Sequence, residues 1–484
     1  MRDPDPVIPP QSSLDHATAR RIVIGVLLTM LLAALDQVVV ATALPTIAAS
    51  LGDIDNMSWV VTANLLSATA VTPLYGKLSD IYGRRTMMLL AIGVFAAGSV
   101  ACALAPNMFA LIGARALQGL GGGGLMPLVQ TIVGDVASPR DRPRYQSYTS
   151  ATFIVSTVGG PLMGGFIAEH LHWSWVFWMN LPFCAAAYLL TSERLKALPR
   201  HDRPHRLDLL GALLMVGAAV ALMLALTWGG RRFPWISPQI VTLILGSAAL
   251  WMLFAIRNMT AREPFIPLSV LRDGAVRVGT ATAFFGVGAV IALTIFLPLY
   301  AQVALGMTVS ESAIAIIALQ GAATVTSLAG GRMIAHFTHY KRVPAISLAI
   351  AIAALVPLAL APTGFSPAMA LSLITLAGLG VGPMFPFTIV VIQNAVPLHQ
   401  LGITTGSMNF FRALGGTFIV TGFGALVLAG APLARGTSSS GLLEATHAAA
   451  SFGLVFGASA FCLAIALGCV LIAEERPLRG STAQ

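Results

Sequence analysis

Apolar residues along the chain gather into long runs, which are separated by short segments rich in charged or turn-forming residues. Residues 209–230 and 278–310, for example, contain no Asp, Glu, Lys or Arg. A helix that crosses a bilayer needs about 20 mostly apolar residues, so each run is long enough for one crossing. The run 343–411 is too long for one helix, and turns at 362–367 and 397–402 divide it. The pattern predicts consecutive membrane helices joined by short loops.

Fourteen helices are expected, which makes the fold class an all-α membrane protein. Their predicted ranges are 22–46, 57–77, 86–105, 107–133, 146–168, 174–195, 208–228, 237–257, 277–304, 311–335, 343–361, 367–393, 403–429 and 447–472. The first 21 residues are polar and the following apolar run is too long for a signal peptide, so no cleavable signal is expected.

The distribution of charge is consistent with this count. Only 10% of the residues are charged, too few to solvate a soluble protein of 484 residues, because soluble domains have about 25%. Of the 28 Lys and Arg residues, 23 fall in segments predicted on the same side of the membrane as the N-terminus. The loops on the other side hold only Arg231, Arg232 and Arg435. By the positive-inside rule both termini are expected to be cytoplasmic. The net charge of +9 therefore reflects topology, and no nucleic-acid partner is expected.

Residues with catalytic or metal-binding chemistry are not arranged in any recognisable pattern. The four cysteines lie inside apolar runs without metal-ligand spacing. There is no HExxH sequence, no second intramembrane carboxylate for a paired-acid site, and no P-loop. We therefore expect no catalytic residue, no metal and no cofactor, and a membrane enzyme is the least favoured class.

The chain repeats itself at a separation of about 255 residues. The sequence GLGGGGLMP at 119–127 matches GLGVGPMFP at 378–386, and Gly-Gly pairs match at 159–160 and 415–416. The repeat pairs the first six predicted helices with the last six and leaves two helices between them. The predicted regions are an N-terminal tail (1–21), a six-helix bundle (22–195), linkers with the inserted helices (196–276), a second six-helix bundle (277–472) and a C-terminal tail (473–484).

A ten-residue segment between the second and third helices carries a distinctive pattern of glycine and charge. Residues 76–85 read GKLSDIYGRR. We expect its two glycines to form tight turns, and Asp80 either to cap the next helix or to bind nearby cations. The segment resembles the signature loop of the major facilitator superfamily, which implies a conformational latch. The residues that match this latch are Gly76, Asp80, Gly83, Arg84 and Arg85.

Two bundles and an inserted pair resemble, over about residues 20–475, the fourteen-span drug:proton antiporter branch of that superfamily. Asp36 is the only acidic residue deep in a predicted span, and an intramembrane carboxylate is by default functional. It lies in ALDQVVVATALP, which resembles the family's first-helix motif, although Val38 replaces an expected polar residue. A structural Asp satisfied by a neighbour is the alternative.

Arg115 opens RALQGLG, which resembles the family motif whose arginine is linked to proton transfer. At 1.5 Å per residue, Asp36 lies about 21 Å from the inner membrane edge, which is about 9 Å from the outer edge of a core about 30 Å thick. Arg115 lies about 12 Å from that outer edge, so the two residues have similar depths. We therefore expect Asp36 and Arg115 to interact directly, or through water or Gln118. The resemblance assigns these three residues to proton coupling and substrate recognition.

The fifth predicted helix contains GGPLMGG, residues 159–165, which resembles the family's antiporter motif. The resemblance implies that this motif packs the helix against the opposite half, and it favours export; generic packing of small residues is the alternative. The residues concerned are Gly159, Gly160, Pro161, Gly164 and Gly165. Polar residues expected to line a cavity, or else to bond neighbouring helices, are Asn64, Gln320, Asn409 and Arg412.

Together these features imply a proton-coupled antiporter that exports amphipathic or cationic compounds across a bacterial inner membrane. The alternative is a dedicated exporter of one metabolite, antibiotic or siderophore, with the same fold. The expected partners are protons, a small-molecule substrate and the lipid bilayer, and participation of a periplasmic adaptor protein is left open.

Overall fold

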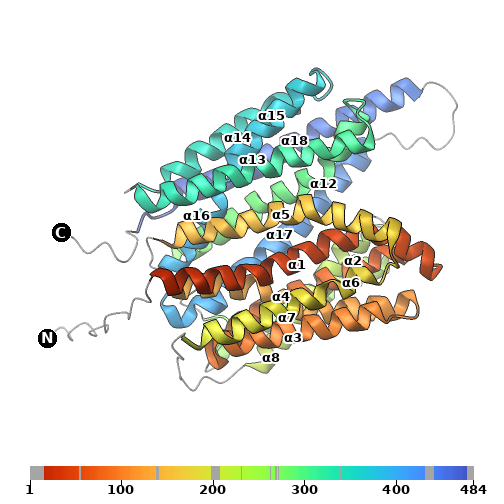
Figure 1. Ribbon diagram of the computed structural model, residues 1–484. Helices are drawn as coiled ribbons and strands as arrows, with labels where there is room; N and C mark the ends of the chain where they lie inside the picture. The colour runs from red at the N-terminus through yellow and green to blue at the C-terminus, as the bar shows by residue number, and fades with distance from the viewer. Residues whose placement is uncertain are drawn as a thin grey trace.

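The structure, a computed structural model, is almost entirely helical (Figure 1). It describes residues 16–53, 56–137, 141–197, 208–230, 232–261, 263–267, 270, 272–337, 339–430 and 441–476. Its long helices are α1 (His16–Leu51), α2 (Met57–Tyr82), α3 (Arg84–Ala103), α4 (Met108–Val136), α5 (Arg142–His170), α8 (Leu209–Trp228), α9 (Pro238–Thr260), α13 (Val309–His336), α14 (Arg342–Leu360), α17 (Leu401–Gly430) and α18 (Gly441–Ile472). Shorter segments are α6 (Trp175–Trp178), α7 (Asn180–Arg194), η1 (Leu195–Ala197), α11 (Gly274–Thr282), η2 (Ala283–Val287), α12 (Gly288–Val303), α15 (Pro367–Val381), α16 (Met384–Ala395) and η3 (Leu398–Gln400).

Each of the fourteen predicted ranges coincides with one helix or with successive helical segments. Three are interrupted: 174–195 between α6 and α7, 277–304 by the π-helical turn η2, and 367–393 at Gly382-Pro383. The last interruption lies at Pro383, which cannot donate a backbone hydrogen bond. Within the described ranges, nine helical stretches are long and apolar enough to cross a membrane. The number of crossings therefore stays a prediction. The predicted tails fall largely outside the described residues.

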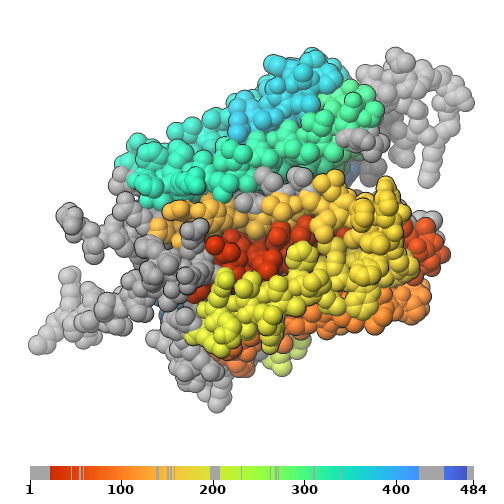
Figure 2. Space-filling model, viewed as in Figure 1, coloured from red at the N-terminus to blue at the C-terminus, as the bar shows by residue number. Residues whose placement is uncertain are grey.

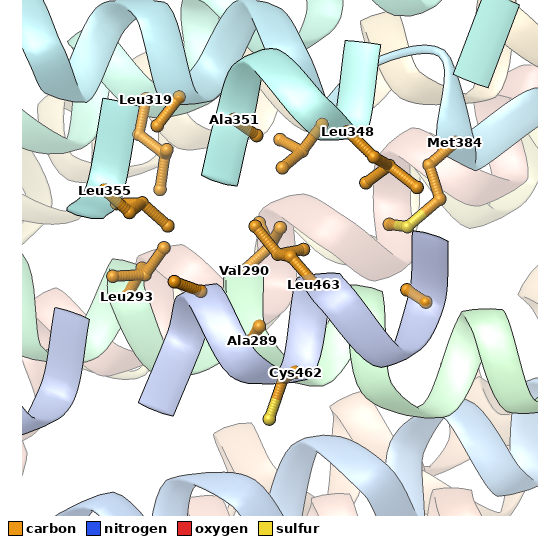
Figure 3. Close-up of a cluster of buried hydrophobic side chains, with 14 of the residues drawn as sticks. Ala289, Val290, Leu293, Leu319, Leu348, Ala351, Leu355, Met384, Cys462 and Leu463 are labelled. Carbon is orange, nitrogen blue, oxygen red and sulfur yellow. The ribbon is translucent and has the colours of Figure 1, made fainter. Parts of the chain in front are cut away.

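Buried apolar side chains form separate cores in the two halves of the chain. Three clusters are built only from the segment between α1 and η1, here called the N-terminal group. The largest cluster is built from α11 to α18 and the residue that follows it, here called the C-terminal group. Figure 3 shows part of this cluster, where Leu355 of α14 faces Leu293 of α12. In lipid, such helix pairs associate through close van der Waals packing and not through exclusion of water.

The two groups meet along a seam that is closed at one end of the molecule. We call this end the terminal face, because α1 begins and α18 ends there (Figure 1). α5 lies beside α13 in Figures 1 and 2, and a Cβ added at Gly331 of α13 would lie 2.4 Å from the carbonyl oxygen of Pro143. α2 lies equally close to α17, where a Cβ at Gly76 would lie 2.3 Å from the carbonyl oxygen of Gly402. Backbone contact at both places brings the groups together near the terminal face.

The inserted helices α8 and α9 pack across the seam where α2 meets α17. Met215 of α8 shares a cluster with Leu74 of α2 and Ile403 of α17. Farther along, the indole of Trp228 stacks edge-on against Trp59 of α2, with ring centroids 5.6 Å apart. The inserted helices α8 and α9 therefore contact both the N-terminal and the C-terminal group.

Candidate functional site

A buried ion pair lies inside the N-terminal group, between α1 and α4. Arg115 Nη1 of α4 donates to Asp36 Oδ2 of α1 at 2.7 Å, and each side chain is 1% exposed. Gln118 Nε2 donates to Asp36 Oδ1 at 2.9 Å, and Asn180 Nδ2 donates to the same oxygen at 2.7 Å. The Asp36 carboxylate therefore accepts hydrogen bonds from three buried side chains, as an anion in a low-dielectric interior requires.

Further groups hold Arg115 and Gln118 in place. Arg115 donates to Gln118 Oε1 and, through Nε, to the carbonyl oxygen of Val60 in α2 at 3.1 Å. Gln118 also donates to Ser99 Oγ of α3 at 2.8 Å. α3 approaches closely because Gly98 has no side chain: a Cβ there would lie 2.4 Å from the Gln118 Cα. The network thus connects α1, α2, α3, α4 and α7.

The structure therefore brings together Asp36, Arg115 and Gln118, by the direct contact expected from their depths. It places them inside the N-terminal group and not at the seam. Sequence analysis missed Asn180 and Ser99 as members. The only available signal was that both are small polar residues within apolar stretches.

A second polar site closes the seam at the terminal face. Asp80 of α2 accepts backbone hydrogen bonds from Gly402 at 3.0 Å and from Ile403 at 2.8 Å. These N–H groups belong to the first turn of α17, where a helix has unpaired donors and a positive dipole end. Asp80 also pairs with Arg84, whose Nε donates to Asp135 Oδ2 at 2.7 Å. A carboxylate of the N-terminal group thus caps a helix of the C-terminal group.

The segment predicted as a loop at 76–85 is mostly helical, which corrects the expected tight turns. α2 continues to Tyr82 and α3 begins at Arg84, so only Gly83, with φ of +89°, links them. Gly76 lies inside α2, and its lack of a side chain admits the backbone of α17. Asp80 does not cap α3, because its carboxylate is turned towards α17. Arg85 donates to the carbonyl oxygen of Ser192 at 2.9 Å, outside the seam.

The glycines of the fifth-helix motif pack within the N-terminal group, which corrects the expectation that they face the opposite half. A Cβ at Gly160 would lie 2.5 Å from the Val38 side chain of α1, and one at Gly164 would lie 2.0 Å from Thr42 Oγ1. Gly159 also faces α1, whereas a Cβ at Gly165 would meet nothing within 4 Å. Val38, the apolar residue that departs from the family pattern, thus packs against the α5 backbone at Gly160. Pro161 lies within a continuous α5 and is exposed.

Amide side chains connect the two groups deeper in the seam. Asn409 Nδ2 of α17 donates to Gln130 Oε1 of α4 at 2.6 Å. Gln393 of α16 donates to the carbonyl oxygen of Gln130 at 3.0 Å and accepts from Gln146 of α5 at 3.2 Å. These contacts extend the closed part of the seam inwards from Asp80.

The remaining predicted cavity residues have different surroundings. Asn64 is buried in α2, and its Oδ1 has no hydrogen-bond partner among the described residues. Gln320 donates to Thr294 Oγ1 at 3.1 Å and so connects α13 with α12 inside the C-terminal group. Arg412 lies in α17 and contacts the thioether of Met126 in α4. Of the four, Asn409 and Arg412 therefore bridge the seam.

Comparisons with known proteins agree on the family. The model of the Major Facilitator Superfamily matches residues 26–420. The chain is 32% identical over 407 residues to the multidrug transporter protein MdtP of Bacillus subtilis, covering 84% of this chain and 75% of that protein. It is 31% identical over 415 residues to multidrug resistance protein 3 of the same organism, covering 84% and 80%.

Solved structures show the same fold at low sequence identity. The human organic anion transporter MFSD10 superimposes with a TM-score of 0.65 at 18% identity, over 92% of this chain and 99% of that one. The proton:xylose symporter XylE superimposes with a TM-score of 0.64 at 14% identity, over 96% and 98%.

Proposed function

Because the chain belongs to the Major Facilitator Superfamily, and is therefore a multi-pass membrane transporter and not an enzyme, we propose that it is a proton-coupled antiporter that exports amphipathic compounds. The names of its relatives, multidrug transporter protein and multidrug resistance protein, support export. We further propose that it belongs to the fourteen-span branch and lies in a bacterial inner membrane with both termini cytoplasmic. The terminal face is then the cytoplasmic face.

The observation that carries the proposal is the buried network around Asp36. An ionised carboxylate is costly in hydrocarbon, so its presence needs a function or a strong structural reason. Proton uptake by Asp36 would remove the charge that holds Arg115 and would weaken the connection between α1 and α4 (N-terminal group). A proton bound there could in this way alter the shape of the group that forms half of the transport route.

The latch supplies the conformational part of the proposal. With Asp80 on the α17 N-terminus, the seam is closed at the terminal face. Export requires that the seam also opens at the terminal face to admit the compound. The backbone hydrogen bonds from Gly402 and Ile403 to Asp80 must then break. We propose that residues 22–195 and 277–472 move as the two units of this exchange.

The cationic part of the expected substrate range loses its support. Asp36 is the only acidic residue deep in a predicted span and so the natural counter-ion for a cationic drug, but Arg115, Gln118 and Asn180 already occupy its carboxylate in this conformation. We therefore restrict the proposal to amphipathic compounds. A dedicated exporter of one metabolite stays the alternative, and an adaptor protein that carries cargo onward stays open.

The test is export by protein reconstituted in liposomes under an imposed pH gradient, with an amphipathic neutral dye as cargo. Asp36→Asn is expected to abolish the dependence of dye movement on the gradient. Glu193→Gln is the matched control, because it makes the same carboxylate-to-amide change at a side chain that is 71% exposed. Gradient-driven export that is equal in the parent and in Asp36→Asn would refute proton coupling through this residue. A set of unrelated dyes distinguishes a broad exporter from a dedicated one.

A further inference from the structure

Arg412 is a cation in the middle of the seam whose contacts do not satisfy it. It lies about 16 Å along α17 from the first residue of that helix, at 1.5 Å per residue. The residue lies far from either end of α17, at membrane depth. Its one described polar contact is the Met126 thioether, which is a weak acceptor. A guanidinium has five N–H donors, so most of its hydrogen-bonding capacity is unused.

Acidic residues are scarce in the part of the sequence that includes α17. Between residues 278 and 443 the only acidic residue is Glu311. Glu311 forms the capping box at the start of α13 with Thr308 and is exposed there. In the N-terminal group, Asp36 is occupied by its own three donors. An unpaired charge at membrane depth is expensive, which points to a ligand as its partner.

The position of Arg412 along the seam shows where that ligand would bind. One turn nearer the terminal face, Asn409 and Gln130 connect α17 and α4 directly. Among the described polar contacts between these two helices, the one from Arg412 to Met126 lies farthest from the terminal face. Arg412 thus lies at the inner limit of the described polar contacts between α4 and α17.

We propose that the transport site takes amphiphiles that carry an anionic group, a carboxylate or a group of equivalent geometry, and that Arg412 binds this group. This inference rests on the proposed function and names its substrate class. A planar guanidinium binds a carboxylate through two parallel charge-assisted hydrogen bonds. A cationic amphiphile would meet a like charge instead. The Met126 side chain, which is flexible and polarisable, suits contact with the apolar part of varied compounds.

The experiment uses two probes that differ in one charge, pyrene-1-butyrate and its methyl ester. Binding to the full chain in nanodiscs is measured by energy transfer from tryptophan to pyrene, with empty nanodiscs correcting for partition into lipid. The parent is expected to bind the acid at least tenfold more tightly than the ester. Arg412→Gln is expected to remove this preference while keeping ester binding, which also shows that the variant is folded. Arg412→Lys is expected to restore part of the preference.

Arg277→Gln is the matched control, because it removes a cation at the exposed start of α11 and is expected to keep the preference. Equal binding of acid and ester by the parent would overturn the inference, and so would a preference that survives Arg412→Gln. The proposed function is tested separately, by gradient-driven export of the ester and its loss in Asp36→Asn. If the protein binds the acid selectively but exports neither probe along a pH gradient, the proposed antiporter function is refuted, whereas the proposed anion site is still supported.

Discussion

Removal of both members of the buried Asp36–Arg115 pair should cost less than the sum of the two single removals. In Asp36→Asn the guanidinium stays buried, at 1% exposure, without the carboxylate that lies 2.7 Å from it. Breaking a buried pair in this way costs about 3–5 kcal/mol. Arg115→Gln should cost a similar amount, because Asp36 then keeps only Gln118 and Asn180. The double variant buries no charge and keeps amide hydrogen bonding, so its loss should fall short of the sum by about 2 kcal/mol or more.

The assay is unfolding in mixed micelles of increasing SDS content, followed by tryptophan fluorescence, for the parent, both single variants and the double variant. The exposed pair Glu193–Lys196 supplies a control cycle, whose coupling should be about 0–0.5 kcal/mol. Strictly additive losses for Asp36 and Arg115 would refute the reasoning, because additivity is expected only of groups that do not interact. The same result would remove the basis for proton-triggered loosening of α1 from α4.

The remaining predictions concern close contacts of helices. Gly164→Ala places a Cβ 2.0 Å from an α1 hydroxyl and should destabilise the protein by about 1–3 kcal/mol in the same unfolding assay, whereas Gly165→Ala, with nothing within 4 Å, should be near neutral. Gly76→Ala should hold the terminal face open, since its Cβ would lie 2.3 Å from an α17 carbonyl oxygen; spin-label distances between α5 and α13 should lengthen, and unchanged distances would contradict the closed latch. Asp80→Asn keeps only one of the two oxygens that accept hydrogen bonds from the α17 backbone. The loss of one such bond, about 1.4 kcal/mol, should raise the population of molecules with an open terminal face about tenfold in the same distance measurement.

Helix positions and the Asp36–Arg115 contact could be predicted because the bilayer restricts the possibilities. Within hydrocarbon the backbone must satisfy its own hydrogen bonds, so an apolar run of sufficient length becomes a helix. The fixed rise of that helix then gives the depth of each residue, and two opposite charges at equal depth have reason to meet. No information about neighbouring helices was needed for either step.

The partners of small and capping residues could not be predicted in the same way. The glycines near Pro161 indicate a close helix crossing, but their sequence does not say which helix crosses, and α1 is the one. Likewise, a carboxylate such as Asp80 can cap any nearby helix start. That it caps α17, more than 300 residues away, depends on the packing of the two groups. The sequence does not explain why position 38 is apolar. The structure does, because the Val38 side chain packs against Gly160 of α5.

The inserted helices α8 and α9 make the two flanks of the molecule unequal. On one flank they cover the line where α2 meets α17, with Met215 between Leu74 and Ile403. On the other flank α5 and α13 meet directly. A lipophilic compound dissolved in the acyl chains would therefore find the covered flank shielded. We expect such a compound to approach sideways from the α5–α13 flank, which would give a molecule built from two similar halves a single preferred entrance from the lipid phase.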